Sequence, residues 1–195
     1  MAPKADPGRP RDRSIDARVL EVARRHLAEH GYDGLSLAAV ADEAGTTRPA
    51  LYRRWPGKAE LATAAIAALS AAHDRRPTDD PYADLVEELR AFRRGISRPD
   101  GLSLVGTMLQ RGTDPELRRL YQERVVTPRR TRFRAILERA VAQGVIPGGD
   151  LELAVGSLTG SFYALALTGT VPTLWPERAA VHAWRALGGT PPEDT

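Results

Sequence analysis

Residues 46–54 (TTRPALYRR) place hydroxyl, aromatic and guanidinium side chains within about two helical turns. Arginine carries a planar fork of donors that matches the paired oxygens of a phosphate or the O6 and N7 acceptors of guanine. Threonine hydroxyls can cap a helix or bond to phosphate. A short helix that only packed into a core would have no use for these side chains. The segment is therefore a candidate surface for binding a polyanion.

The surrounding sequence predicts that this segment is the second helix of a helix-turn-helix. Counted from Leu37, a small residue, Ala41, stands fifth, where two helices would cross closely. Gly45 stands ninth, where the turn needs a left-handed residue, and Leu51 stands fifteenth, where it can anchor the second helix to the first. The second helix of such a unit lies in the DNA major groove, with its N-terminal residues near base edges. We expect the three helices at 15–30, 37–44 and 48–54.

The predicted DNA contacts gather at the start of the helix 48–54. Arg48 can bond to guanine through two donors, and Tyr52 and Arg53 lie on the flank that faces phosphate or a thymine methyl group. Lys58 opens the following helix, where its backbone and side chain both suit the DNA backbone. The complete predicted set is Ser36, Thr46, Thr47, Arg48, Pro49, Tyr52, Arg53 and Lys58.

Residues 31–61 (GYDGLSLAAVADEAGTTRPALYRRWPGKAEL) resemble the TetR family of bacterial transcriptional regulators. The shared features are a Gly-aromatic turn, a Ser-led helix, the Ala-Gly turn, an apolar-Tyr pair and Lys-x-x-Leu. Thr46, Trp55 and Gly57 depart from the residues usual at their positions. The resemblance implies an all-α protein with an N-terminal three-helix, helix-turn-helix DNA-binding domain. A larger helical ligand-binding and dimerisation domain is expected to follow it.

Helical periodicity continues through the rest of the chain. Expected helices lie at 57–76, 82–97, 101–111, 115–143, 150–168 and 176–187, and Pro128 is expected to kink the longest of them. The predicted organisation is a flexible basic arm at 1–13, the DNA-binding domain at 14–60, the ligand-binding and dimerisation domain at 61–187, and a disordered tail at 188–195.

Helix 150–168 carries little charge and has small residues at i, i+4 spacing, so it needs a partner helix. In the family, the last two long helices of each subunit form the dimer interface. The resemblance therefore places a homodimer interface here, with Gly156, Gly160, Ser161 and Trp184 in it. Burial of these helices inside one subunit is the alternative. A dimer would present its two recognition helices ~34–36 Å apart, which matches a palindromic site.

The resemblance also implies a pocket for a small-molecule effector. Aromatic residues and methionine suit an apolar or aromatic ligand. The candidate lining residues are Leu102, Leu104, Val105, Met108, Tyr121, Phe133, Leu137, Phe162, Tyr163 and Trp175. Each of these side chains could instead pack in the core.

Several other functions find little support in the sequence. His26 and His30 have the spacing of two metal ligands on a helix, but no third ligand is evident, and we expect no metal, no cofactor and no catalytic residues. The arginine run at 129–134 is expected to be the solvated face of a helix. The chain has no cysteine, so disulfide and thiolate chemistry are excluded. No apolar run approaches ~20 residues, which predicts no membrane span and a soluble, cytoplasmic protein.

Charge and motif together predict a regulator of transcription. The net charge is +3 and the isoelectric point is about 9.6, which is compatible with a polyanion partner. We expect a homodimeric repressor that binds a palindromic operator and is released by a ligand, with the helix that begins near residue 57 transmitting the change. The alternatives are a regulator that activates or needs no ligand, and an enzyme with an appended helix-turn-helix.

Overall fold

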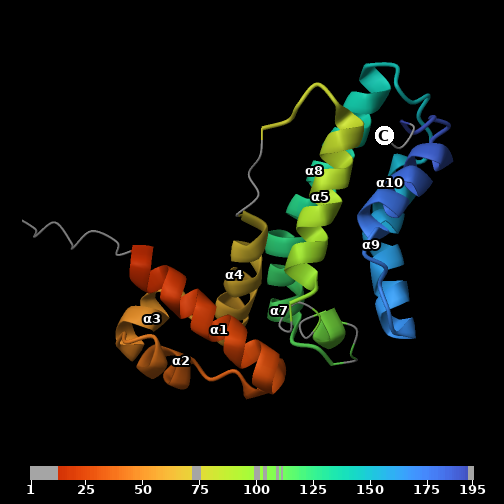
Figure 1. Cartoon of the computed structure of the whole chain (residues 1–195). Helices are drawn as coiled ribbons and strands as arrows, with labels where there is room; N and C mark the ends of the chain where they lie inside the picture. Colours follow the sequence, from red (N-terminus) through yellow and green to blue (C-terminus); the bar gives the residue numbers. More distant parts are fainter. Residues whose placement is uncertain are drawn as a thin grey trace, which may run out of the picture.

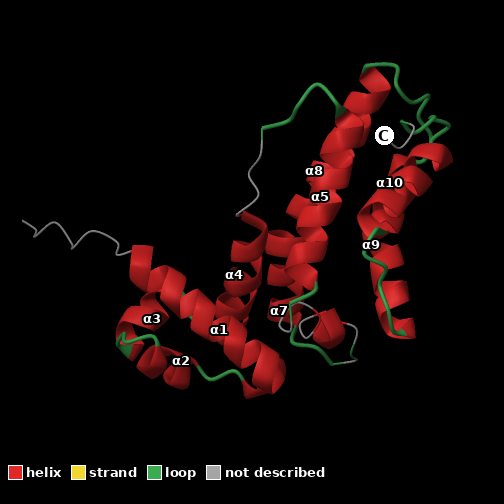
Figure 2. Cartoon of the chain, in the orientation of Figure 1, coloured by secondary structure: helices red, strands yellow, loops and turns green. Residues whose placement is uncertain are grey.

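A computed structural model of the chain describes residues 13–71, 76–98, 102, 105–108, 110 and 112–192. Every regular element within these residues is helical, which confirms the all-α prediction (Figure 2). The N-terminal part holds α1 (Arg13–Gly34), α2 (Leu37–Glu43), α3 (Arg48–Arg54) and α4 (Lys58–Ala71). The remainder holds α5 (Pro81–Ile96), α7 (Pro115–Tyr121), the π-helical segment η1 (Gln122–Val126), α8 (Thr127–Ala142), α9 (Leu151–Thr168) and α10 (Trp175–Ala186).

The helices form two packed groups, one N-terminal and one C-terminal. In Figure 1, α1–α3 occupy one end, α9 and α10 occupy the other, and α5 and α8 stand between them. The N-terminal core is built from α1, α2 and α3, where Leu27, Ala41 and Leu51 are fully buried. The same core continues into α4, α7 and η1. It therefore runs past the domain boundary predicted between residues 60 and 61.

Helix α4 joins the N-terminal core to the rest of the chain. Leu61, Ala62 and Ala65 have no exposed surface, and the buried hydroxyl of Thr63 donates to the carbonyl of Ala59 at 2.7 Å. Such a serine- or threonine-to-backbone bond satisfies a polar group that would otherwise be costly to bury. Helix α4 packs against α1 on one side and against α7 and η1 on another. A displacement of α4 would therefore disturb the packing on both of these sides.

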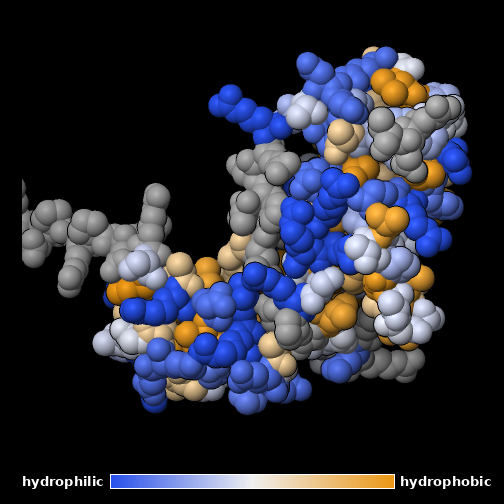
Figure 3. Space-filling model, viewed as in Figure 1, coloured by the Kyte–Doolittle hydropathy of each residue, from blue (hydrophilic) through white to orange (hydrophobic). Residues whose placement is uncertain are grey.

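The second core lies between α5, α8, α9 and α10. Trp184, predicted at the dimer interface, is fully buried there and packs edge-on against Tyr82 with ring centroids 5.1 Å apart. That prediction is wrong because α10 turns its tryptophan inward, toward α5. The outward face of α5 is charged, with Arg90 and Arg94 exposed, and Figure 3 shows a hydrophilic surface over this helix.

Helix α9 is only partly covered by its own chain. Its 18 residues have a mean hydropathy of 1.3, and 22 % of them are buried. By length and composition alone this helix could cross a membrane, although the sequence predicts no span. Its buried side packs against α8 and α10 through Val155, Leu158 and Phe162. The opposite side leaves Leu153 and Leu167 largely exposed.

The predicted helices and the structure differ most clearly at three places. Gly31 adopts φ 66° and ψ −174°, which is almost exclusively a glycine conformation, and the chain then resumes a helical turn to Gly34. The helix expected to reach residue 76 is described as far as Ala71, and Arg76 lies in a loop. At the expected kink, Pro128 is the second residue after η1, so the hydrogen-bond pattern widens just before the proline ring removes a donor.

Other expectations fall partly outside the described residues. The flexible arm predicted at 1–13 lies outside them except for Arg13, and of the helix predicted at 101–111 only 102 and 105–108 are described as helical. The predicted disorder of the tail does not hold at its start. The backbone N–H of Gly188 donates to Arg185 and that of Gly189 to Trp184, both at 3.0 Å. Residues 193–195 lie outside the description.

A pair of glycine substitutions tests the backbone assignment. Gly45 has φ +67°, so Gly45→Ala should lower the free energy of unfolding by about 1 kcal/mol or more. Gly95 lies inside α5 with open space around its Cα, so Gly95→Ala should raise it by up to about 1 kcal/mol. Denaturant unfolding of both variants measures the two effects. Equal effects of the same sign would contradict the left-handed turn.

Candidate nucleic-acid interface and cavities

The turn between α2 and α3 has the geometry that the residue spacing predicts. Ala41 is fully buried where the two helices meet, and Leu51 is fully buried on the facing side. Gly45 adopts φ 67°, and the N–H of Thr46 returns to the carbonyl of Ala41 at 3.0 Å. The small, left-handed and apolar positions are therefore confirmed in their structural roles. Together they fix the angle at which α3 leaves the turn.

Side-chain caps set the first turn of each helix. The hydroxyl of Thr47 accepts from the N–H of Ala50 at 3.3 Å, and the hydroxyl of Ser36 accepts from Ala39 at 3.4 Å. Pro49 occupies the first turn of α3, where its missing N–H costs nothing. At the other end, Trp55 is nearly buried and its N–H bonds to Leu51. The caps leave the start of α3 open to solvent.

The exposed side of α3 carries the predicted recognition residues. Tyr52 is 48 % exposed, and Thr47, Arg48 and Arg53 are also exposed, while Thr46 is half-buried. The nearest carboxylate to Arg48 is Asp42, 3.6 Å away, and both side chains are more than half exposed. An ion pair this exposed to water contributes little to stability, and another anion can readily replace the carboxylate. The guanidinium of Arg48 is thus available to a ligand.

Lys58 is engaged differently from the prediction. Its Nζ donates to the backbone carbonyl of Asp33 at 2.7 Å and lies 4.8 Å from the ring centroid of Tyr32. The side chain thus ties the start of α4 to the end of α1. The Tyr32 hydroxyl in turn donates to Asp114 at 3.2 Å, and burial together with that carboxylate raises the pKa of Tyr32. The bond to Asp33 uses one of the three N–H donors of the Lys58 ammonium, so a phosphate contact would have to use another.

Ion pairs that the sequence did not predict hold the helix-turn-helix against α1. Arg54 at the end of α3 pairs with Asp16 at 2.8 Å. Glu43 at the end of α2 accepts from His26 at 2.8 Å and from Arg25. The hydrogen bond from His26, reinforced by Arg25, lowers the pKa of Glu43. His26, considered above as a metal ligand, is therefore paired with a carboxylate.

A cavity of about 150 Å³ lies where α7, η1, α8 and α9 meet. It collects four of the predicted pocket residues: Val105, Tyr121, Phe133 and Tyr163. The lining is completed by five residues that the sequence did not predict there: Val126, Arg129, Arg130, Val155 and Thr159. Arg129 also corrects the interpretation of 129–134 as a solvated face. Arg129 is half-buried, and its guanidinium carbon lies 4.7 Å from the ring centroid of Phe92 on α5.

The other predicted pocket residues are not in this cavity. Phe162 and Trp175 stack against each other with centroids 5.1 Å apart, as part of an aromatic cluster that includes Phe92. Leu137 is fully buried in the second core, Met108 packs against the N-terminal core, and Leu102 is 42 % exposed. Leu104 lies outside the described residues. Their residue types suit a pocket, but residue type alone does not separate a lining position from a core or an exposed position.

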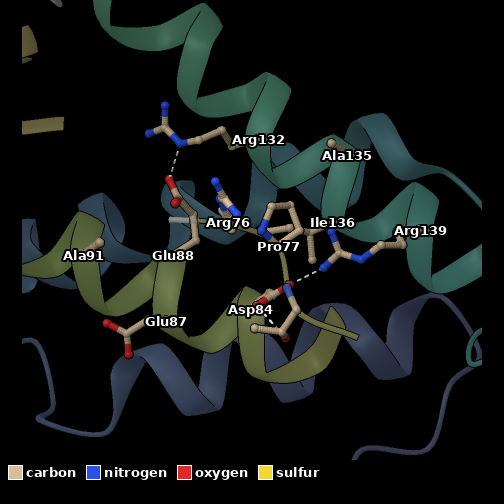
Figure 4. A pocket seen from close by; sticks show the side chains of 11 residues that line it. Arg76, Pro77, Asp84, Glu87, Glu88, Ala91, Arg132, Ala135, Ile136 and Arg139 are labelled. Atoms are coloured by element: carbon tan, nitrogen blue, oxygen red, sulfur yellow. Dashed lines mark hydrogen bonds and ion pairs between the residues drawn. The ribbon is translucent and has the colours of Figure 1, made fainter. Parts of the chain in front are cut away.

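A second cavity, of about 340 Å³, lies between the 76–78 loop, α5 and α8. Figure 4 shows charged side chains facing one another across it. Arg132 bonds to Glu88 at 2.8 Å, Arg139 bonds to Asp84, and Thr78 bonds to the same Asp84 through its N–H and its hydroxyl at 2.9 Å. The arginines of α8 that line it are thus neutralised by carboxylates of α5. The loop is fastened to α5 by the same network.

Helices α1–α3 form a three-helix head in which α3 is capped and exposed, and a helical bundle follows it. This arrangement defines a helix-turn-helix DNA-binding protein. Residues 19–65 match the family model described as bacterial regulatory proteins, tetR family, and residues 75–183 match the tetracyclin repressor-like C-terminal domain. The chain belongs to the TetR family, so it is a DNA-binding transcription regulator.

Relatives and solved structures agree with this assignment. The uncharacterized HTH-type transcriptional regulator YdeS of Bacillus subtilis is 28% identical over 167 residues, covering 83% of each chain. The DNA-binding transcriptional repressor TetR of Mycobacteroides abscessus is 29% identical over 140 residues, covering 69% of this chain and 72% of the relative. A TetR transcriptional regulator from Agrobacterium tumefaciens shares the fold, with a TM-score of 0.68, 22% identity, and coverage of 88% of this chain and 93% of that one.

The cap of α3 can be tested without DNA. Thr47→Ala removes the acceptor for the Ala50 N–H and should lower the free energy of unfolding by about 1 kcal/mol, whereas Thr47→Ser should keep most of it. Thr46→Ala is the neighbouring control and should change it by less than about 0.5 kcal/mol. Denaturant unfolding measures all three variants. A Thr47→Ala variant with an unchanged free energy of unfolding would show that the cap contributes nothing to stability.

Proposed function

We propose that the protein is a homodimeric repressor that binds a palindromic operator and is released by a small-molecule ligand. The observation that carries the DNA-reading part is the exposed N-terminal end of α3, where Thr47, Arg48, Tyr52 and Arg53 face solvent from a rigidly capped helix. Arg48 reads a guanine, and Tyr52 and Arg53 contact the backbone or a thymine methyl group. The role is non-enzymatic and cytoplasmic, as for a regulator that works on DNA.

The dimer face in this proposal is the uncovered side of α9. Leu153, Gly160, Ala164 and Leu167 are exposed and follow one another at spacings of seven, four and three residues, so they share one side of the helix. Leu167 is 84 % exposed, and a groove of about 250 Å³ runs beside this side, between α9 and α10. A second copy would cover the apolar stripe. Of the predicted interface residues, Gly160 lies on it, while Ser161 accepts a bond from Trp175 beside it.

The proposed transmission runs from the 150 Å³ cavity to α4 through η1. Tyr121 and Val126, which line the cavity, bracket the π-helical segment. Within that segment, Arg124 donates to the carbonyl of Glu60 and to the hydroxyl of Thr63, both at 3.3 Å. Its neighbour Val125 is buried in the N-terminal core. A ligand that shifts η1 would therefore shift α4, and α4 carries the head.

Fluorescence anisotropy on labelled DNA from upstream of the gene tests the proposal as a whole. Titration at two salt concentrations, against excess nonspecific DNA, should show tight binding that survives competitor, with two protomers per site. Binding that disappears with competitor and modest salt would mean phosphate contact alone and would overturn operator reading on that DNA.

The role of Arg48 can be separated from general basicity. Arg48→Gln should weaken operator binding by about 1–3 kcal/mol and reduce the preference over nonspecific DNA. Arg90→Gln removes another exposed guanidinium, on α5, where it pairs with Glu177, and should leave the affinity unchanged. The anisotropy assay compares the two. Equal losses would show that only net charge matters at Arg48.

The dimer face is tested by a charge placed on the apolar stripe. Leu167→Asp should shift the protein toward monomers in sedimentation velocity and weaken operator binding, because a buried carboxylate without a partner opposes association. Val145→Asp makes the same kind of change at another exposed apolar side chain, in the loop before α9, and should leave the dimer intact. A Leu167→Asp protein that stays dimeric would place the interface elsewhere.

A further inference from the structure

The cavity beside η1 combines aromatic walls with cationic side chains. Tyr121, Phe133 and Tyr163 supply three rings, and Val105, Val126 and Val155 supply aliphatic surface. Its volume of about 150 Å³ is that of a cavity known to hold one benzene molecule. The space therefore suits a single aromatic ring and is too small for a drug-sized ligand.

Arg129 is the cation of this cavity that has no carboxylate partner among the described residues. The other four arginines of α8 are all paired: Arg130 and Arg134 with Glu152, Arg132 with Glu88, and Arg139 with Asp84. Arg129 instead faces the ring of Phe92 and the hydroxyl of Tyr163. A ring face and a phenol only partly offset a half-buried positive charge.

The tyrosine hydroxyls beside Arg129 remain neutral donors. Burial raises the pKa of Tyr121 and of Tyr163, which keeps both phenols protonated at physiological pH. Neutral hydroxyls can donate to an anion, whereas ionised phenolates would repel it. The lining of the cavity thus contains the guanidinium of Arg129 and two tyrosines with neutral hydroxyls, next to a ring-sized apolar space.

We propose that the effector is a one-ring aromatic carboxylate, whose carboxylate pairs with Arg129 and whose ring fills the space between Tyr121, Phe133 and Tyr163. This rests on the proposed ligand-responsive function, and it adds a negative charge to the apolar or aromatic ligand expected from the sequence. The guanidinium fork matches a carboxylate, and the pair is partly shielded from water, so it is strong enough to discriminate between ligands. Entry of the ring presses on Tyr121 and Val126 at the two ends of η1.

Benzoate and its neutral analogue benzamide test the ligand class on the full-length wild-type protein. Isothermal titration calorimetry without DNA should show saturable benzoate binding that is about tenfold or more tighter than that of benzamide. This comparison needs no variant, so folding cannot confuse it. Equal affinities, or no benzoate binding at millimolar concentration, would overturn the proposal.

Two matched variants then locate the charge. Arg129→Gln should lower benzoate affinity by about tenfold or more and leave benzamide affinity nearly unchanged. Arg132→Gln removes an arginine of the same helix that faces the second cavity, and should change neither. Far-ultraviolet circular dichroism checks that both variants fold. Loss of benzoate binding in Arg132→Gln, or its retention in Arg129→Gln, would place the carboxylate outside the cavity beside η1.

Operator release is measured separately, so the two proposals can fail independently. In the anisotropy assay, saturating benzoate should dissociate the wild-type protein from operator and leave the Arg129→Gln complex intact. Specific operator binding without any benzoate binding would keep the regulator and discard this effector class. Benzoate binding that leaves the operator complex unchanged would keep the site and discard ligand release.

Discussion

The burial of α4 is the constraint on which the rest of the structure depends. This helix is apolar on nearly every side, and it can be so only because α1 covers one side and α7 with η1 cover another. The hydroxyl of Thr63, at its centre, is satisfied by the helix backbone and by Arg124. Because α4 is packed between the head and the bundle, the head has no orientation that is independent of the bundle. Any rearrangement at η1 must change the packing of α4 or break it.

The parts of the molecule that sequence predicted well are those that local geometry determines. The crossing of α2 and α3 needs Ala41 to be small, Gly45 to have positive φ and Leu51 to be apolar, and these three requirements fall within fifteen residues. Caps such as Ser36 and Thr47 act on N–H groups three residues away. Such patterns need no knowledge of the tertiary structure, so the head and its exposed face followed from the residues alone.

The parts that sequence predicted poorly depend on contacts between distant segments. Trp184 was expected at the interface because the family resemblance places the last two long helices there, but whether its side chain faces its own core or a partner is decided by where α5 lies. Lys58 looked free for DNA, yet its partner Asp33 is twenty-five residues earlier. The ten candidate pocket residues were all suitably apolar, and only packing separated the four that line the cavity from those in the core. Periodicity reports which side of a helix is apolar, not what covers it.

The arginines of α8 show how tertiary structure turns a uniform charge run into distinct roles. Successive residues of a helix are rotated by about 100°, so Arg130 and Arg134 point one way, toward α9, and Arg132 and Arg139 point another way, toward α5. Arg129 points in a third direction, where the facing groups are aromatic. The chain balances four of these charges with its own carboxylates. The fifth stands in a cavity that adjoins η1, and η1 is bonded to α4 through Arg124. An anion that pairs with Arg129 would therefore bind next to η1, the segment whose Arg124 is bonded to α4.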